Sequence, residues 1–149
     1  MSYADLIRLY FERSDALQWL WTLYVIVIGG LLAFSSLRQR PDLVTAALVT
    51  VLYCCFAYKN LGAIGDVTMQ RQAVLESMRQ RHESGADTAN TAQLRQTLEP
   101  TLVAPSYEGV RNFHIASDLL TLAAVWAMEW RRWRKRREEL NPAIVQRVP

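Results

Sequence analysis

The sequence has almost none of the side chains from which metal and cofactor sites are built. Its 149 residues include two cysteines, Cys54 and Cys55, which are neighbours and do not readily form a disulfide with each other. No Cys-x-x-Cys pair and no Cys/His ligand set is present, so we expect no metal and treat both cysteines as small apolar residues. Of the two histidines only His114 lies near a long apolar run, whereas haem held between helices needs two well-placed ligands. We therefore expect no cofactor.

Catalytic motifs are missing as well. There is no glycine-rich phosphate loop, no nucleophile elbow and no zinc-binding histidine pair on a helix. His114 is followed four residues later by Asp118, but no nucleophile and no second acid accompany this pair. The sequence therefore indicates a protein that is not an enzyme.

The net charge is small and unevenly distributed. The whole chain carries a formal charge of +3. Residues 131–149 hold seven basic and two acidic side chains, which leaves the rest of the chain slightly acidic. Because a nucleic-acid-binding protein is expected to carry a basic patch over its folded surface, no nucleic-acid partner is predicted.

The hydrophobic residues, 51% of the chain, are concentrated in three blocks. Residues 17–37 carry no charge and are long enough for a helix that crosses a bilayer, which takes about 20 residues. They are too long for a cleaved signal peptide, and the residues before them are too mixed in charge. Residues 43–65 are interrupted only by Lys59, and residues 113–130 form a third, less apolar block. The predicted fold class is an all-α integral membrane protein with three transmembrane helices.

Basic residues set the expected orientation. The segment RQRPD alone separates the first two blocks, so residues 17–65 should form a tight transmembrane hairpin with Arg38 and Arg40 at its tip. Pro41 suits the first turn of a helix, and Asp42 suits the positive end of its dipole. The third block is followed at once by a dense basic run. Because basic segments stay in the cytoplasm, we expect a multi-pass cell-membrane protein with its N-terminus outside and a basic cytoplasmic tail.

Two segments outside the spans are expected to be helical. In residues 1–16 apolar and charged side chains fall on opposite helical faces, so this amphipathic helix should lie on the outer membrane surface or pack on a partner subunit. Residues 66–112 should form an extracytoplasmic loop whose first part continues the second helix outward, with an apolar stripe that suits a helix seam. Residues 83–93 are typical of a flexible connector. Aromatic residues, Tyr24 and Tyr53 among them, are expected at the bilayer interfaces.

A polar stripe lies on one face of the third block. A charge that faces lipid at mid-membrane costs roughly 2.5–3.5 kcal/mol, so Asp118 should turn inward and pair with Lys59 or His114. The resulting intramembrane cluster is either a structural lock on helix packing or the mouth of a wet path, such as a pore lining or a proton site. Its predicted members are Asp118, Lys59, His114, Ser117, Thr121, Gln18 and Thr22.

Two further sets of contacts are predicted. The basic run after the third block should contact anionic lipid headgroups, where each basic group contributes about 1 kcal/mol, or else act only as a topology anchor. Gly29 and Ala33 form a small-x-x-x-small pair that suits close helix packing, either against the second helix or between copies of the chain. The headgroup contacts are assigned to Arg131, Arg132, Arg134, Lys135, Arg136 and Arg137.

The layout of three spans, an outside N-terminus and a basic inner tail resembles that of one class of phage holins, from which the long outer loop departs. This resemblance implies an oligomeric ion channel or a membrane-permeabilising protein. Three helices are too few to enclose a pore or a solute site alone, so assembly with copies or with another membrane protein is expected. The leading hypothesis is an accessory, scaffold or sensor component of a membrane complex, and the channel is the alternative.

Overall fold

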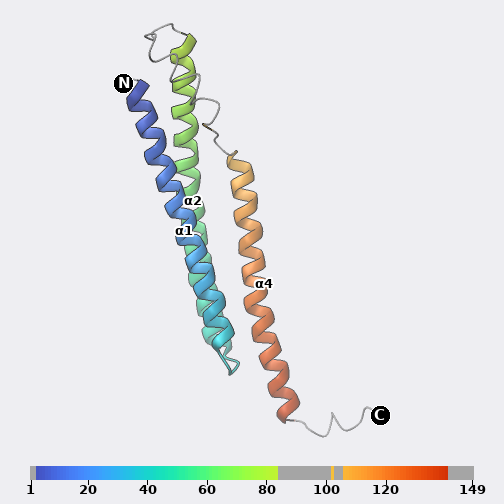
Figure 1. Cartoon of the computed structure of the whole chain (residues 1–149). Helices are drawn as coiled ribbons and strands as arrows, with labels where there is room; N and C mark the ends of the chain where they lie inside the picture. The colour runs from blue at the N-terminus through green and yellow to red at the C-terminus, as the bar shows by residue number, and fades with distance from the viewer. Residues whose placement is uncertain (1–2, 84–101, 103–105, 141–149) are drawn as a thin grey trace. The chain divides into compact units, whose positions relative to one another are not determined.

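A computed structural model describes residues 3–83, 102 and 106–140, and in this part of the chain the regular structure consists of three α-helices (Figure 1). They are α1 (Tyr3–Leu37), α2 (Leu43–Glu83) and α4 (Tyr107–Leu140). The expectation of an all-helical protein is confirmed. With 35 and 41 residues, α1 and α2 are about 52 and 61 Å long at 1.5 Å per residue, well above the roughly 30 Å of a bilayer's hydrocarbon core.

Two of the three helices, α1 and α2, are long and apolar enough to cross a membrane. The core helix of a soluble protein would be mostly buried, whereas only 17% and 22% of the residues in their most apolar windows are buried. Helix α4 does not reach the same hydropathy, because its central part contains His114, Asp118 and Glu129.

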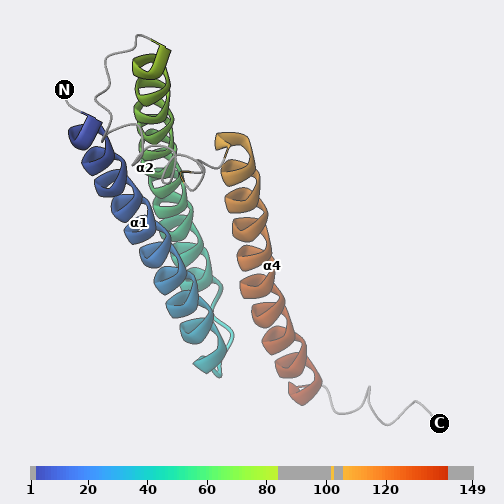
Figure 2. The same ribbon diagram turned by 45° about the horizontal axis from the view of Figure 1, so that its top comes forward.

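The first helix differs from the expected division into a surface helix and a span. Helix α1 runs without a break from Tyr3 to Leu37 (Figure 2). No proline lies in this segment, and its first glycine is Gly29, so nothing interrupts the helix between the amphipathic turns and the apolar turns. The amphipathic part and the first apolar block are therefore one continuous element.

The turn between α1 and α2 is held by the cap of α2. The Asp42 carboxylate accepts hydrogen bonds from the backbone N–H groups of Val44 and Thr45, at 3.1 and 3.2 Å, and from the Thr45 hydroxyl. These are the bonds by which an N-cap aspartate satisfies the first free amides of a helix. The hydrogen bond from the Thr45 hydroxyl, followed by that from its amide, lowers the pKa of the Asp42 carboxyl.

The contacts divide the chain into two compact units. Unit 1 comprises Met1–Thr22 and Asn60–Phe113, and unit 2 comprises Leu23–Lys59 and His114–Pro149. Each of the long helices contributes to both units. The predicted connector 83–93 and the end of the tail, 141–149, lie outside the described residues apart from Glu83.

Unit 1 has an apolar core between the first turns of α1 and the distal half of α2. Tyr3, Leu6 and Tyr10 of α1 are buried against Val74 and Met78 of α2. The apolar face that was expected to lie on the membrane or on a partner is thus covered within the chain, by the stripe that was expected to form a helix seam.

Two contacts reinforce unit 1. The buried Arg71 guanidinium lies 4.8 Å from the Tyr10 ring centroid and donates a 2.6 Å hydrogen bond to its hydroxyl. A cation over an aromatic face is attracted by the ring quadrupole, which offsets part of the cost of burying the arginine. At Gly65 an added Cβ would lie 2.8 Å from the Tyr107 ring, so the absence of a side chain lets the start of α4 approach α2 closely.

Candidate functional site

Unit 2 buries both polar and apolar side chains. Four of its polar or charged residues are buried, with exposed fractions of 3% for Ser35, 0% for His114, 5% for Thr121 and 3% for Glu129, and Tyr24, Ala46, Tyr53, Ala57 and Val125 are buried as well. Its exposed surface carries many large apolar side chains, which is unusual for a soluble domain. They include Val25, Ile26, Phe34, Leu37, Leu43, Val44, Leu48, Val51, Leu52, Ile115, Leu119, Leu120, Trp126 and Trp130.

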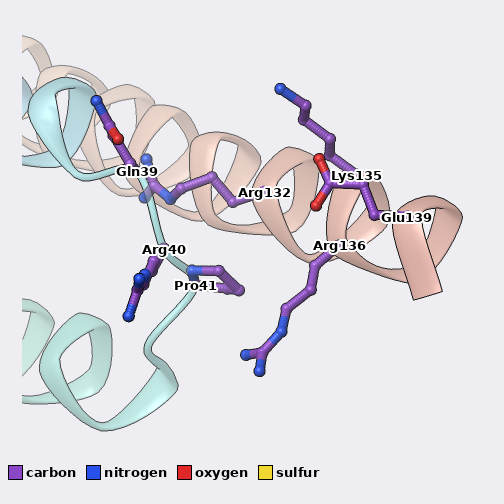
Figure 3. Close-up of a pocket in the computed structure, with 7 residues that line it drawn as sticks. All are labelled: Gln39, Arg40, Pro41, Arg132, Lys135, Arg136 and Glu139. Carbon is purple, nitrogen blue, oxygen red and sulfur yellow. The ribbon is translucent and has the colours of Figure 1, made fainter.

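The basic residues of α4 do not all have the same surroundings. Arg132 is half-buried, whereas the other five predicted headgroup residues are exposed. Arg134 forms a 3.0 Å ion pair with Glu138, and the Arg137 guanidinium lies 3.9 Å from the Trp133 ring centroid. Lys135 and Arg136 face a cavity of about 900 Å³ that the α1–α2 turn also lines (Figure 3).

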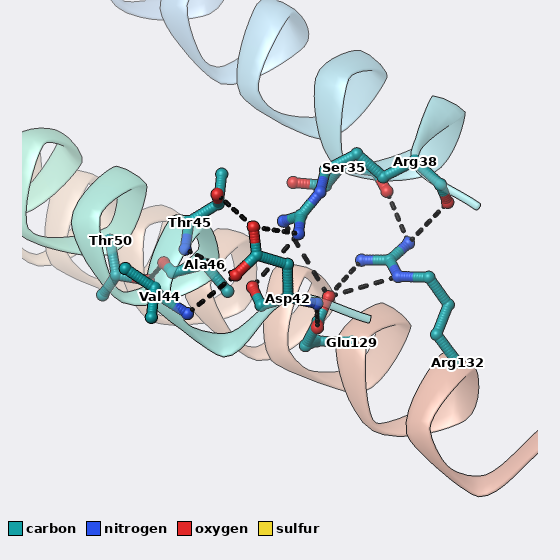
Figure 4. Close-up of polar contacts among 9 residues, drawn as sticks. All are labelled: Ser35, Arg38, Asp42, Val44, Thr45, Ala46, Thr50, Glu129 and Arg132. Atoms are coloured by element: carbon teal, nitrogen blue, oxygen red, sulfur yellow. Dashed lines mark hydrogen bonds and ion pairs between the residues drawn. The ribbon is translucent and has the colours of Figure 1, made fainter. Parts of the chain in front are cut away.

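An ionic cluster joins the α1–α2 turn to α4 (Figure 4). We call Glu129, Arg132, Arg38 and Asp42 the Glu129 cluster. The Glu129 carboxylate accepts hydrogen bonds from Arg132 Nη2 at 2.7 Å and from the Asp42 backbone N–H at 2.7 Å. Arg38 Nη1 lies 3.9 Å from the same carboxylate, and Arg38 Nη2 donates to the Asp42 carbonyl at 3.1 Å. The buried Glu129 carboxylate thus has two cations and one backbone amide around it. A carboxylate that is removed from water needs such partners to replace its lost hydration.

Arg132 also closes the C-terminal end of α1. Its Nη1 donates to the carbonyl of Ser35 at 2.6 Å and lies 3.3 Å from the carbonyl of Arg38. The last carbonyls of a helix have no partner within the helix, so a cation at this end satisfies them and complements the helix dipole. One guanidinium therefore links α4 to α1, while Glu129 links α4 to the start of α2.

A second cluster surrounds Asp118. Its Oδ1 accepts hydrogen bonds from the hydroxyls of Tyr24 on α1, at 2.8 Å, and Tyr53 on α2, at 2.7 Å. Its Oδ2 lies 2.8 Å from Nδ1 of His114, which is fully buried. The tautomer of His114 sets the direction of this hydrogen bond. We call these four residues the Asp118 cluster, and it connects all three helices within unit 2.

Stacking adds to the hydrogen bonds of the Asp118 cluster. The Tyr24 ring lies 4.1 Å from the imidazole of His114, centroid to centroid, with 33° between their planes. The Tyr24 hydroxyl also lies 3.3 Å from the His114 carbonyl. The histidine is therefore fixed on both sides, by the carboxylate four residues later and by an aromatic ring of another helix.

The structure brings together some of the predicted polar residues and leaves others apart. Of the two partners expected beside Asp118, His114 is in contact, whereas Lys59 is exposed and makes no ion pair with it in the described part of the chain. Thr121 is buried and donates to the Ser117 carbonyl at 2.8 Å. Gln18 and Thr22 belong to unit 1 and are exposed, and the Thr22 hydroxyl donates to the Gln18 carbonyl at 2.9 Å.

The small-residue pair of α1 is open. Gly29 and Ala33 are both exposed, and an added Cβ at Gly29 would have no heavy atom within 4 Å outside its local backbone. The pair therefore does not serve as a close contact with α2 among the described residues.

Tyr24, Tyr53 and Glu129 belong to the two clusters but are not among the site residues predicted from the sequence. Residue type alone places Tyr24 and Tyr53 at the bilayer interface. Their pairing with Asp118 could have been inferred, because a buried tyrosine hydroxyl needs a hydrogen-bond partner and an inward-facing aspartate needs donors. Glu129 and Arg132 have the i, i+3 spacing of a helical ion pair, which was another signal.

The described residues contain no group of three or more histidine, cysteine or acidic side chains that could hold a metal ion. Both cysteines are exposed on α2. The chain matches no protein-family model, no curated protein and no solved structure.

The Glu129 cluster predicts a large effect of one neutral substitution. Glu129→Gln keeps the shape of the side chain but leaves Arg132 without its buried counter-charge. Breaking a buried pair on one side costs about 3–5 kcal/mol, and partial access of water to Arg132 reduces this figure. We expect thermal unfolding in detergent at a clearly lower temperature. The control is Glu138→Gln, which breaks an exposed pair on the same helix worth below about 1 kcal/mol. Equal shifts for the two variants would refute the role of the cluster.

The Asp118 cluster predicts coupling between two helices. Tyr53→Phe removes one donor to a charged acceptor, a loss of about 1.5–3 kcal/mol in the free energy of unfolding. In a double-mutant cycle, Asp118→Asn and Tyr53→Phe should be non-additive, because the first removes the charge of the acceptor and the second removes the donor of the same hydrogen bond. Tyr58→Phe, at an exposed tyrosine of α2, and Lys59→Gln are the controls and should not couple to Asp118→Asn. Recovery of stability by Lys59→Gln would contradict the observed pairing.

Proposed function

We propose that this chain is a small non-enzymatic integral membrane protein that crosses the bilayer three times and acts by assembly, as an accessory, scaffold or sensor component of a membrane complex. The observation that carries the proposal is that both carboxylate oxygens of Asp118 are engaged in hydrogen bonds. Both carboxylate oxygens hold partners from the same chain, one on each of the three helices. A carboxylate committed in this way locks helices together and is a poor ion or proton carrier.

The distribution of side chains on α4 supports its assignment as the third span. His114 and Glu129, which lower its mean hydropathy, are buried. The opposite face is apolar and exposed over the length that a span requires, about 20 residues. Its members are Phe113, Ile115, Leu119, Leu120, Trp126 and Trp130. In water such a face would be a large apolar patch, whereas in a bilayer it meets hydrocarbon.

Charge supports the orientation. The α1–α2 turn and the C-terminal half of α4 both carry exposed basic side chains, and they meet in the same unit. Basic segments beside spans stay in the cytoplasm. The proposed N-terminus and the 66–112 loop are then outside the cell.

The open small-residue face supports assembly. Gly29 and Ala33 on α1 are exposed, and among the described residues nothing beyond the local backbone lies within 4 Å of a Cβ added at Gly29. Small residues on a lipid-facing helix let a second backbone approach. In the proposed role this face receives either a second copy or a helix of another membrane protein.

Orientation predicts the behaviour of two reporter fusions. A reporter that is active only in the cytoplasm should be active when fused after Pro149 and silent when inserted near Gly85. The control is the same reporter fused to a soluble cytoplasmic protein, which sets full activity. The reverse pair of results would overturn the orientation.

Assembly predicts a complex heavier than one chain in mild detergent, measured as the protein mass of the purified particle. Gly29→Leu should reduce this mass to that of one chain, since a bulky side chain blocks close helix approach. The matched control is Gly62→Leu, at an equally open glycine of α2, which should leave the mass unchanged. A single-chain mass for the unmodified protein, or ion conductance after reconstitution into liposomes, would overturn the proposal, and conductance would establish the channel alternative.

A further inference from the structure

The cavity between the α1–α2 turn and α4 has the chemistry of an anion site. It has a volume of about 900 Å³, and Arg40, Lys135 and Arg136 line it together with the carboxylate of Glu139. None of these three cations forms an ion pair with another described residue. Arg132 also lines the cavity, but its charge is already compensated by Glu129. Three basic side chains thus line one hollow with a single carboxylate, which leaves a net positive charge there.

The cavity walls come from two elements far apart in the sequence. Arg40 and Pro41 belong to the turn, whereas Arg136 is on α4, and in Figure 3 Pro41 lies between the two arginine side chains. The Glu129 cluster holds the turn against α4, because Glu129 accepts a hydrogen bond from the Asp42 amide and Arg132, itself a lining residue, donates to the Ser35 carbonyl. A site built on a rigid pair of elements binds with less loss of entropy than a flexible basic tail.

We propose that this cavity binds the headgroup of an anionic phospholipid, with Arg40 and Arg136 holding the phosphodiester. Arginine suits this role because its planar fork of N–H donors matches two phosphate oxygens. The surroundings favour a lipid over free phosphate. Leu37 and Leu43, which flank the turn, are 80% and 63% exposed, so surface suited to acyl chains adjoins the basic hollow. Basic pockets between transmembrane helices on the cytoplasmic side are known to take such headgroups.

Glu139 narrows the class of headgroup. A carboxylate beside a phosphate site is unfavourable unless it accepts hydrogen bonds from the same ligand. Hydroxyl groups of a glycerol or inositol headgroup provide such donors, whereas the ionised phosphodiester itself carries no proton to donate. The favoured ligand is therefore an anionic phospholipid whose headgroup carries hydroxyls.

This inference deepens the headgroup contact expected from the basic run, and it rests on the proposed membrane location. In place of non-specific attraction between the basic run and anionic lipid, we assign a defined site that includes Arg40 of the turn and excludes Arg137. Arg137 does not line the cavity, and its guanidinium lies over the Trp133 ring. Arg136 and Arg137 are neighbours with equal charge and are both exposed, so they form a matched pair for a test.

The experiment measures binding of phosphatidylglycerol, relative to phosphatidylcholine, to the purified full chain in mild detergent by native mass spectrometry. Arg40→Gln and Arg136→Gln should each weaken phosphatidylglycerol binding by roughly fivefold, the value of one basic group near the surface. Arg137→Gln should retain the affinity of the unmodified chain. Excess inorganic phosphate should not displace the lipid. Circular dichroism of each variant checks that helix content is unchanged.

Other outcomes overturn the inference. Equal losses in all three variants would show diffuse charge attraction, and retained affinity in Arg40→Gln or Arg136→Gln would exclude the site. Displacement by inorganic phosphate would mean that the site takes the free anion. Flotation of the chain with phosphatidylcholine vesicles separates this test from the proposed function. A chain that does not float contradicts membrane insertion, whereas a chain that floats without preference for phosphatidylglycerol contradicts only the headgroup site.

Discussion

A carboxylate removed from water must find its partners within the protein, and this constraint shapes the whole of unit 2. Helix α4 carries two inward-facing carboxylates, Asp118 and Glu129, eleven residues apart. Eleven residues are close to three helical turns, so the two groups lie on nearly the same face, about 16 Å from each other along the axis. Each is surrounded by partners from both other helices or their ends. The two carboxylates therefore fix the rotation of α4 about its own axis at two positions along the helix.

The two clusters use different chemistry. Around Asp118 the partners are tyrosine hydroxyls and one imidazole, which suit a site with apolar neighbours because aromatic rings bring their own packing surface. Around Glu129 the partners are arginines and free backbone groups of helix ends, which suit a level where water and headgroups are close. The hydrogen bonds of both clusters join different helices, so together they select one arrangement of α4 against the other elements of unit 2.

Unit 1 follows the ordinary rule of soluble proteins. Its core consists of apolar faces of α1 and α2, and its buried Arg71 is held by an aromatic ring and a hydroxyl. The same continuous helices thus contribute to a core of apolar faces in unit 1 and to the two polar clusters in unit 2.

Hydrophobic pattern and chain length determined much of this structure in advance. The three helical blocks, the tight turn at Pro41 and Asp42, and the continuation of α2 beyond its apolar block follow from local preferences and from the length of apolar runs. The inward direction of Asp118 and its contact with His114 follow from the cost of a charge in lipid and from i, i+4 geometry. Only the tertiary structure decided which other helices supply the partners. Tyr24 and Tyr53 are 94 and 65 residues from Asp118, and Lys59, an equally plausible partner by charge, is on an exposed face. The relative rotation of three helices selects among such candidates, and rotation depends on the packing of all their faces together, which no local pattern contains.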